Sequence, residues 1–283
     1  MKPKRFNVKK FIIFLSGFLI SSVIFSFVSF DNGEPVKVCS WNIRDFGKTK
    51  SDQEIAFIAN TLRDYDIILL QEVVAGFGGA QAVARLNDEL NRKGAKWDYS
   101  VSDPTYGDSY KTERYAYLWK PSKIKKVGSA WLEQHYKLEI DREPYYATFN
   151  KSGKEFTLVN FHAITKSKQP ETEVRYFRFL PARYPDLNLI FCGDFNLPQS
   201  HTVFNPLKGM GYSPILRNQK TTIKREYFKG ECLASEFDNA FFNKSKVITR
   251  DAKMIPFYQS FSTLKEAHMI SDHAPISFEL LLN

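Results

Sequence analysis

The chain after residue 35 alternates between short apolar runs and polar turns. Apolar, β-branched or aromatic runs of about four to eight residues are typical of strands, and apolar residues at every third or fourth position are typical of helices. We predict strands over 36–43, 66–72, 114–121, 145–150, 155–163, 187–196, 235–242 and 276–282. We predict helices over 51–65, 80–93 and 171–184.

Local sequence features support this division. Ser51 and Glu54 have the spacing of a capping box, which satisfies backbone N–H groups at the start of a helix. The sequence KSGK at 151–154 is a turn between two strands and indicates an antiparallel hairpin. Strands and helices are mixed, and no linker divides residues 36–283. The pattern therefore predicts a single α/β domain, a sandwich with mixed sheets.

The first 30 residues have the composition of a targeting segment. Five Lys or Arg residues and no acid lie in residues 1–10, and residues 11–30 are uncharged and mostly apolar. Such a stretch is typical of a signal peptide and is also long enough for a membrane anchor. A buried core helix is the alternative, although it would show a polar face. The membrane interpretations predict export, with the domain secreted, periplasmic or anchored outside the cytoplasmic membrane, after a linker at 31–35.

Charge and cysteine usage narrow the function classes. The formal net charge is +9, and five positive charges lie in the first ten residues, which leaves +4 for the rest. A mildly basic domain is consistent with a polyanionic partner and equally with a solvated basic surface. The three cysteines have no CxxC or Cys/His spacing, which argues against structural zinc. Cys39 and Cys192 fall in apolar strands and are predicted to be buried.

Polar residues recur where the predicted strands end. Any one of them could cap a turn. If these ends meet in space, their carboxylate and amide oxygens suit a hard divalent cation such as Mg²⁺ or Mn²⁺, and not zinc. The residues at the five strand ends are Asn42; Glu72; Asn160 and His162; Asp194 and Asn196; Asp272 and His273.

Eight motifs follow one another along the chain: WNIRDFG, LLQE, SYKTERYAYLWKP, DREP, NFHA, GDFN, FDNAFF and SDH. In order and spacing they resemble the endonuclease/exonuclease/phosphatase superfamily, and within it most closely deoxyribonuclease I. The resemblance runs from about residue 36 to the C-terminus. It implies a four-layer α/β sandwich, with two packed mixed β-sheets flanked by helices. It also implies a phosphodiesterase that depends on Mg²⁺, with Mn²⁺ or Ca²⁺ as alternatives.

The resemblance further implies a role for each motif residue. The implied metal ligands are Glu72, Asn42 and Asp272. The implied catalytic residues are His162 oriented by Glu113, His273 oriented by Asp238, and Asp194 with Asn196 at the nucleophilic water and the phosphate. The implied substrate or phosphate contacts are Arg44, Tyr110, Arg142 and Asn160.

Hydrolysis of a phosphodiester needs a base that takes a proton from water and an acid that protects the leaving alkoxide. A histidine paired with a carboxylate can serve in either role. We predict His273 as the base and His162 as the acid, with Asp194 as an alternative base.

Two features depart from the deoxyribonuclease I pattern. Val74 stands where that branch has a basic residue that enters the minor groove, and the glycine-rich sequence AGFGGAQ follows it. The paired cysteines near GDFN are not both present, so we expect no disulfide there. We still predict a monomer that hydrolyses DNA with little sequence preference. The alternatives are a phospholipid or phosphoinositide phosphodiesterase and a non-catalytic binding domain.

Overall fold

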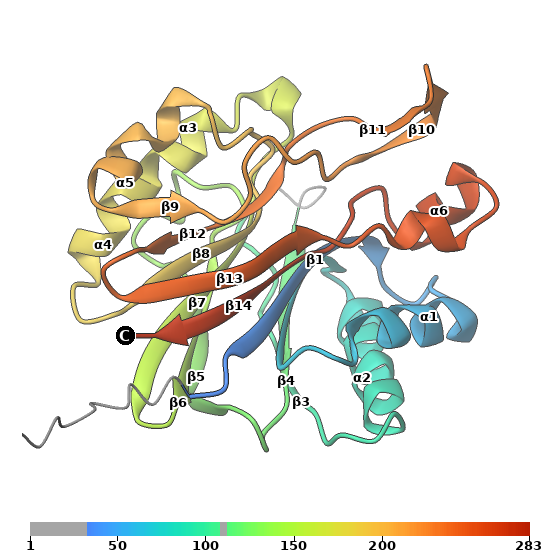
Figure 1. Cartoon of the computed structure of the whole chain (residues 1–283), viewed down its shortest axis with the longest axis horizontal. Coiled ribbons are helices and arrows are strands. Elements are labelled where there is room, and N and C mark those ends of the chain that lie inside the picture. Colours follow the sequence, from blue (N-terminus) through green and yellow to red (C-terminus); the bar gives the residue numbers. More distant parts are fainter. Residues whose placement is uncertain (1–32, 108–111) are drawn as a thin grey trace, which may run out of the picture. The chain divides into compact units, whose positions relative to one another are not determined.

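A computed structural model of the protein describes residues 33–107 and 112–283. These residues form two six-stranded β-sheets with helices on their outer sides, and a separate two-stranded hairpin (Figure 1). Each sheet combines parallel and antiparallel pairs. The predicted α/β sandwich of two mixed sheets flanked by helices is confirmed.

The first sheet has the strand order β13-β14-β1-β2-β4-β3. Strands β1 and β2 are parallel, and the other pairs are antiparallel. The β1–β2 pairing shifts register between Asn42 and Phe46 of β1, and the β2–β4 pairing shifts between Leu70 and Val73 of β2. Both β1 and β2 therefore leave regular pairing near their ends. The strands are β1 (Val36–Phe46), β2 (Ile67–Val74), β3 (Asp98–Val101), β4 (Glu113–Trp119), β13 (Val247–Met254) and β14 (Ile276–Leu282).

The second sheet has the strand order β5-β6-β7-β8-β12-β9, with β7 and β8 parallel. Gly193 in β8 has φ of 144°, and a Cβ there would lie 2.0 Å from the Phe161 carbonyl oxygen of β7. Only glycine allows this close approach beside Asp194. The strands are β5 (Lys125–Leu132), β6 (Tyr145–Lys151), β7 (Lys154–His162), β8 (Leu189–Asp194), β9 (Tyr212–Pro214) and β12 (Asp238–Asn243).

Three apolar clusters hold the layers together. The middle cluster joins the two sheets face to face, with residues such as Ile67 and Tyr117 from the first and Phe149 and Ile190 from the second. A second cluster packs helices α1 (Asp52–Leu62), α2 (Phe77–Asn91) and α6 (Leu264–Ile270) on the first sheet. A third packs α3 (Glu171–Val174), α4 (Leu180–Arg183) and α5 (Asn205–Gly209) on the second. Burial of these apolar faces produces the four layers.

The helices differ in part from the sequence prediction. The capping box of Ser51 and Glu54 is present at the start of α1. The helix predicted over 171–184 is divided into α3, the 3₁₀ helix η2 (Arg175–Phe179) and α4. Pro181 lies in the first turn of α4 and lacks the N–H that a continuous helix would use. Further 3₁₀ helices are η1 (Lys166–Lys168), η3 (Thr202–Phe204) and η4 (Phe257–Ser260).

All three cysteines are free, and Cys39 and Cys192 are buried as predicted. The predicted targeting segment at 1–30 lies outside the described residues. Among the residues that the structure describes, no helix is both long and apolar enough to cross a membrane.

Candidate active site

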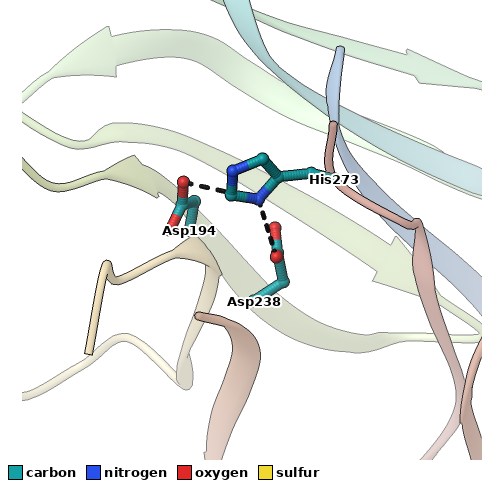
Figure 2. A group of neighbouring side chains, drawn as sticks. All are labelled: Asp194, Asp238 and His273. Carbon is teal, nitrogen blue, oxygen red and sulfur yellow. Dashed lines mark hydrogen bonds and ion pairs between the residues drawn. The ribbon is translucent and has the colours of Figure 1, made fainter. Parts of the chain in front are cut away.

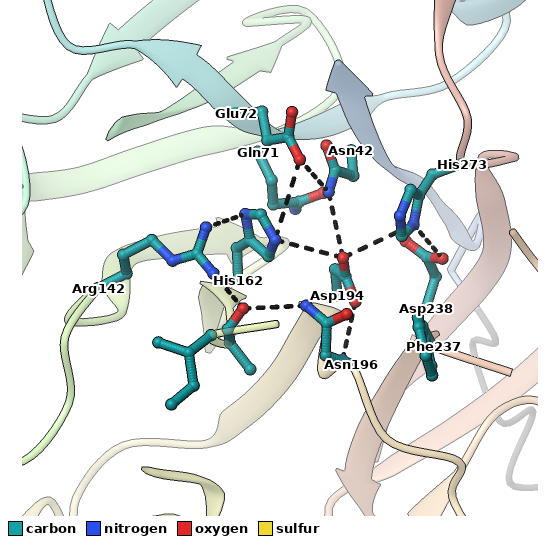
Figure 3. A network of polar contacts seen from close by, with 12 residues as sticks. Asn42, Gln71, Glu72, Arg142, His162, Asp194, Asn196, Phe237, Asp238 and His273 are labelled. Carbon is teal, nitrogen blue, oxygen red and sulfur yellow. Dashed lines mark hydrogen bonds and ion pairs between the residues drawn. The ribbon is translucent and has the colours of Figure 1, made fainter. Parts of the chain in front are cut away.

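The polar strand ends of both sheets meet at one edge of the sandwich, as Figure 3 shows for most of them. Strands β1, β2 and β4 contribute from the first sheet, β7, β8 and β12 from the second, and the segment before β14 adds one histidine. The predicted residues that come together are Asn42, Glu72, Glu113, Arg142, His162, Asp194, Asn196, Asp238 and His273.

His162 and Glu113 form the first imidazole–carboxylate pair. His162 Nδ1 lies 2.9 Å from Glu113 Oε2, and Arg142 Nη1 lies 3.0 Å from the same oxygen. Burial raises the pKa of Glu113, but the charges of His162 and Arg142 outweigh it and hold the pKa below its ordinary value. The ionised carboxylate therefore holds Nδ1 of the ring, and His162 Nε2 lies 3.4 Å from Asp194 Oδ2.

His273 and Asp238 form the second pair (Figure 2). His273 Nδ1 lies 2.8 Å from Asp238 Oδ2. The Thr221 hydroxyl donates to the same oxygen at 2.6 Å and accepts from the Asp238 N–H at 3.0 Å. Thr221 is fully buried. This residue could not be predicted from the sequence, because a threonine in the polar stretch QKTTIK has no pattern that distinguishes it from a turn residue.

In the protein without a cation, the neighbouring carboxylates raise the pKa of both rings. Burial and Arg142 lower the pKa of His162, but Glu113 and Asp194 raise it further, so the net shift is upward. Burial likewise lowers the pKa of His273, while Asp238 and Asp194 raise it well above its ordinary value. Burial raises the pKa of Asp238, and the nearby Asp194 adds to this effect.

Asp194 is the centre of the cluster. Its Oδ2 accepts from Asn42 Nδ2 at 3.1 Å and lies 3.6 Å from His273 Nδ1. Its Oδ1 accepts from the Asn196 N–H at 2.8 Å, and Asn196 adopts a left-handed φ of 51°. Burial raises the pKa of Asp194, but His273 and His162 outweigh it and lower the net value. Asp194 is therefore a buried carboxylate that is held ionised between two imidazoles.

Glu72 and Asn42 present oxygen atoms that suit a divalent cation. Asn42 Nδ2 donates to Glu72 Oε1 at 3.1 Å and to Asp194, as Figure 3 shows. Within residues 33–107 and 112–283, Asn42 Oδ1 is buried and has no hydrogen-bond partner. Glu72 has φ of 58°, and 28% of its side chain is exposed. A partly open carboxylate beside an unpaired amide oxygen is the donor set that a hard cation prefers.

A second group, made of two carboxylates and one imidazole, has the spacing of side chains that could hold a metal ion. The ligand atoms of Asp194, Asp238 and His273 all lie within 4.8 Å of one another. His273 Nδ1 and Asp238 Oδ2 are already bonded to each other, so this group is better described as a hydrogen-bonded pair beside Asp194. Asp272 is not a member of it. The Asp272 carbonyl accepts from the Ile223 N–H at 2.7 Å, and its carboxylate is close enough to raise the pKa of His273.

The predicted substrate contacts have different positions. Arg44 follows Asn42 by two positions in β1, and about half of its side chain is exposed. Arg142 is buried beside His162. Tyr110 lies outside the described residues.

Asn160 differs from the prediction of a phosphate contact. Its side chain is fully buried, and its amide donates to the carbonyls of Leu70 and Ala116 and accepts from Gln71 Nε2. Both N–H groups of the amide are therefore used inside the protein. Asn160 connects β7 to strands of the first sheet beneath the site, and it has no donor left for a substrate.

Comparisons with known proteins support a phosphodiester hydrolase. The chain belongs to the Endonuclease/Exonuclease/phosphatase family, whose sequence model matches residues 39–273.

Individual relatives are similar over most of the chain. A deoxyribonuclease of Thioalkalivibrio sp. (strain K90mix) is 26% identical over 264 residues, which cover 85% of this chain and 70% of the relative. Deoxyribonuclease-1 of Bos taurus is 27% identical over 270 residues, which cover 88% and 93%. The solved catalytic domain of human Nocturnin has the same fold, with a TM-score of 0.62 at 16% identity over 88% of this chain and 95% of that one.

Thr221 is expected to position Asp238 for catalysis. Thr221→Val removes a hydrogen bond to a buried carboxylate, so we expect kcat for a phosphodiester substrate to fall about tenfold or more while KM stays unchanged. Thr221→Ser keeps the hydroxyl and should restore kcat. Steady-state kinetics of both variants measures this effect, with thermal unfolding as the control for folding. A folded Thr221→Val protein with the kcat of the wild type would contradict the role.

The pKa of His273 provides a separate test. In the metal-free protein this pKa lies well above its ordinary value because of Asp238 and Asp194. Asp238→Asn removes one negative charge next to the ring, so the imidazolium is less favoured and the pKa should fall. An NMR titration of the imidazole measures both values. The same midpoint in wild type and variant would show that Asp238 does not determine the charge of His273.

Proposed function

We propose that the protein is a divalent-metal-dependent nuclease that hydrolyses DNA with little sequence preference. The observation that carries this proposal is the arrangement around Asp194, with one imidazole–carboxylate pair on each side. A phosphodiester placed between the pairs would meet groups for the nucleophile and for the leaving oxygen. The deoxyribonuclease relatives, each at least 25% identical, support DNA as the substrate.

Each side chain has a defined task in this mechanism. In its neutral form, His273 takes a proton from the attacking water through Nε2, because its Nδ1 is held by Asp238. His162 donates a proton to the leaving alkoxide through Nε2, because its Nδ1 is held by Glu113. Asp194 is the alternative acceptor. Both assignments require that the carboxylate partners fix the orientation of the rings, which the distances of 2.8 and 2.9 Å support.

Glu72 and Asn42 would hold the divalent cation. Their carboxylate and amide oxygens fit Mg²⁺, with Mn²⁺ and Ca²⁺ as alternatives, and Asp272 remains a predicted further ligand. The bound cation would neutralise negative charge that develops on the phosphate. Asn42 Nδ2 also donates to both Glu72 and Asp194. These two hydrogen bonds would hold the cation ligand Glu72 at a fixed position relative to Asp194.

Plasmid nicking tests this function. We expect the full chain with Mg²⁺ to nick supercoiled plasmid, and a chelator to abolish nicking. Glu72→Gln should remove most activity because a hard cation loses a charged ligand, and His162→Ala should reduce it about 10²-fold or more. Release of head groups from phospholipid vesicles without nicking would favour the lipid phosphodiesterase. A folded protein that hydrolyses neither substrate would favour the binding domain.

We also propose that the catalytic domain acts outside the cytoplasm. The support is the sequence of residues 1–30, a basic stretch followed by a long uncharged segment. Cell fractionation should place the domain beyond the cytoplasmic membrane, either released or anchored. Recovery of the full-length chain as a soluble cytoplasmic protein would contradict export.

A further inference from the structure

A groove lies between the hairpin of β10 (Ile223–Phe228) and β11 (Glu231–Leu233) and the helix α6. Figure 1 shows that this hairpin extends from the sheets on the same side as α6. The groove has a volume of about 610 Å³ and is lined by Arg225 and Tyr227 of the hairpin, and by Lys265 and His268 of α6. Arg44 also lines it, and this residue follows Asn42 by two positions in β1. The hairpin groove, defined by these five residues, therefore begins beside the candidate active site.

The hairpin is attached directly to the catalytic segment. The Ile223 N–H donates to the Asp272 carbonyl at 2.7 Å, and Thr222 pairs with His273 as an isolated bridge. On the other side, His268 Nε2 of α6 lies 3.0 Å from the Lys224 carbonyl. These contacts fix the hairpin groove relative to the His273 imidazole, so a ligand in the groove has a defined position relative to a reacting phosphate.

The charges of the groove favour an anionic occupant. Arg44, Arg225 and Lys265 line it together with one carboxylate, Glu226. Arg44 is close to Asp45, with 3.6 Å between Nε and Oδ2, but about half of its side chain is exposed. Three cations against one acid along a single groove would attract a chain of phosphates.

Aromatic rings on the hairpin add a second kind of contact. Tyr227 and Phe228 are each 63% exposed, although large aromatic side chains usually bury most of their surface. The ammonium groups of Lys224 and Lys229 lie 5.6 and 5.5 Å from the centre of the Phe228 ring. Exposed rings next to cations are the combination that binds the bases and the phosphates of unpaired nucleotides together.

We propose that the hairpin groove binds a single-stranded stretch of nucleic acid next to the scissile phosphate. Arg44, Arg225 and Lys265 contact the phosphates, and Tyr227 stacks on a base inside the groove. Phe228 is the next residue of β10 and does not line the groove, so it stacks on a base where the strand passes the end of the hairpin. This inference rests on the proposed nuclease function and adds a preference for substrates with unpaired nucleotides. Bases inside a duplex already stack on their neighbours and present only their edges, so the exposed faces of the rings suit a single strand.

The shape of the site argues for a nucleic acid over a lipid surface. Tyr227 lines a concave groove, whereas a bilayer is contacted by apolar side chains that project from a convex surface. Arg44 lines the groove and follows Asn42 of the candidate site by two positions in β1, so one polymer could contact both places. A lipid surface remains an outcome that the experiment separates.

The test compares the full chain with its Tyr227→Ala/Phe228→Ala variant. The substrates are a fluorescent single-stranded oligonucleotide and bis(p-nitrophenyl) phosphate, a small diester that is too short to reach the hairpin. We expect the ratio of kcat/KM for the oligonucleotide to kcat/KM for the small diester to fall at least about fivefold in the variant, the loss expected from one stacked base. Cleavage of a blunt duplex should be affected less.

Phe179→Ala is the matched control. Phe179 is also a partly exposed ring next to a cation, with Arg178 Cζ 4.5 Å from its centre, but it belongs to the helical layer on the second sheet. Figure 1 places the helices α3 and α4, between which Phe179 lies in the sequence, on the other side of the molecule from the hairpin. We expect its ratio to equal that of the wild type.

Three outcomes would overturn the inference. Equal ratios in the double variant and the wild type would show that the rings do not contact the strand. An equal loss in Phe179→Ala would show that the effect is not specific to the groove. Weaker binding of the double variant to phosphatidylserine vesicles, with unchanged oligonucleotide cleavage, would assign the hairpin to a lipid surface.

A binding measurement distinguishes failure of the proposed nuclease function from failure of the proposed binding of a single strand in the groove. If the wild type cleaves no nucleic acid, fluorescence anisotropy of the same oligonucleotide in chelator measures binding alone. Binding that weakens at least about fivefold in the double variant would support the groove even then. Equal binding of both proteins, or binding by neither, would overturn it.

Discussion

The burial of Asp194 is the constraint on which the site depends. A carboxylate that is 1% exposed would be costly in the protein interior unless hydrogen bonds and opposite charges compensate it. Four groups supply this compensation: the imidazoles of His162 and His273, the amide of Asn42 and the backbone N–H of Asn196. They come from both sheets, so the ionised state of Asp194 requires that the two sheets pack in one particular register.

Each imidazole next to Asp194 has a carboxylate partner, and the second partner of that carboxylate differs between the two pairs. His162 relies on Glu113, whose second partner is the Arg142 guanidinium, and the pKa of Glu113 is lowered. His273 relies on Asp238, whose second partner is the neutral hydroxyl of Thr221, and the pKa of Asp238 is raised. The surroundings of the two pairs therefore differ in charge, although each consists of one ring and one carboxylate.

The central strands and most of the site could be predicted from the sequence, because both leave a local pattern. Strands β1, β2, β7 and β8 are buried on both faces and appear as apolar runs, and polar residues at their ends were expected to meet. The strands β5 and β13 were missed since they lie at sheet edges and many of their side chains are exposed.

Other errors concern interactions that no local pattern records. Thr221 and Asn160 are both polar residues whose hydrogen bonds reach across the fold, to Asp238 in one case and to the first sheet in the other. From the sequence, Asn160 looked like a strand-end ligand and Thr221 like part of a loop. Only the packing of the sheets determines that the first is buried and that the second donates to a carboxylate of the candidate site.

The backbone carries part of the cost of this arrangement. Glu72 and Asn196 both have left-handed φ values, 58° and 51°, which cost free energy for residues with a side chain. Glu72 has this conformation where its side chain accepts from Asn42, and Asn196, just after β8, has it where its backbone N–H donates to Asp194. Asn42 Oδ1 adds a buried acceptor that has no partner in the described part of the chain. The apolar cluster between the sheets must offset these costs, so the stability of the fold and the chemistry of the site depend on the same packing of one sheet against the other.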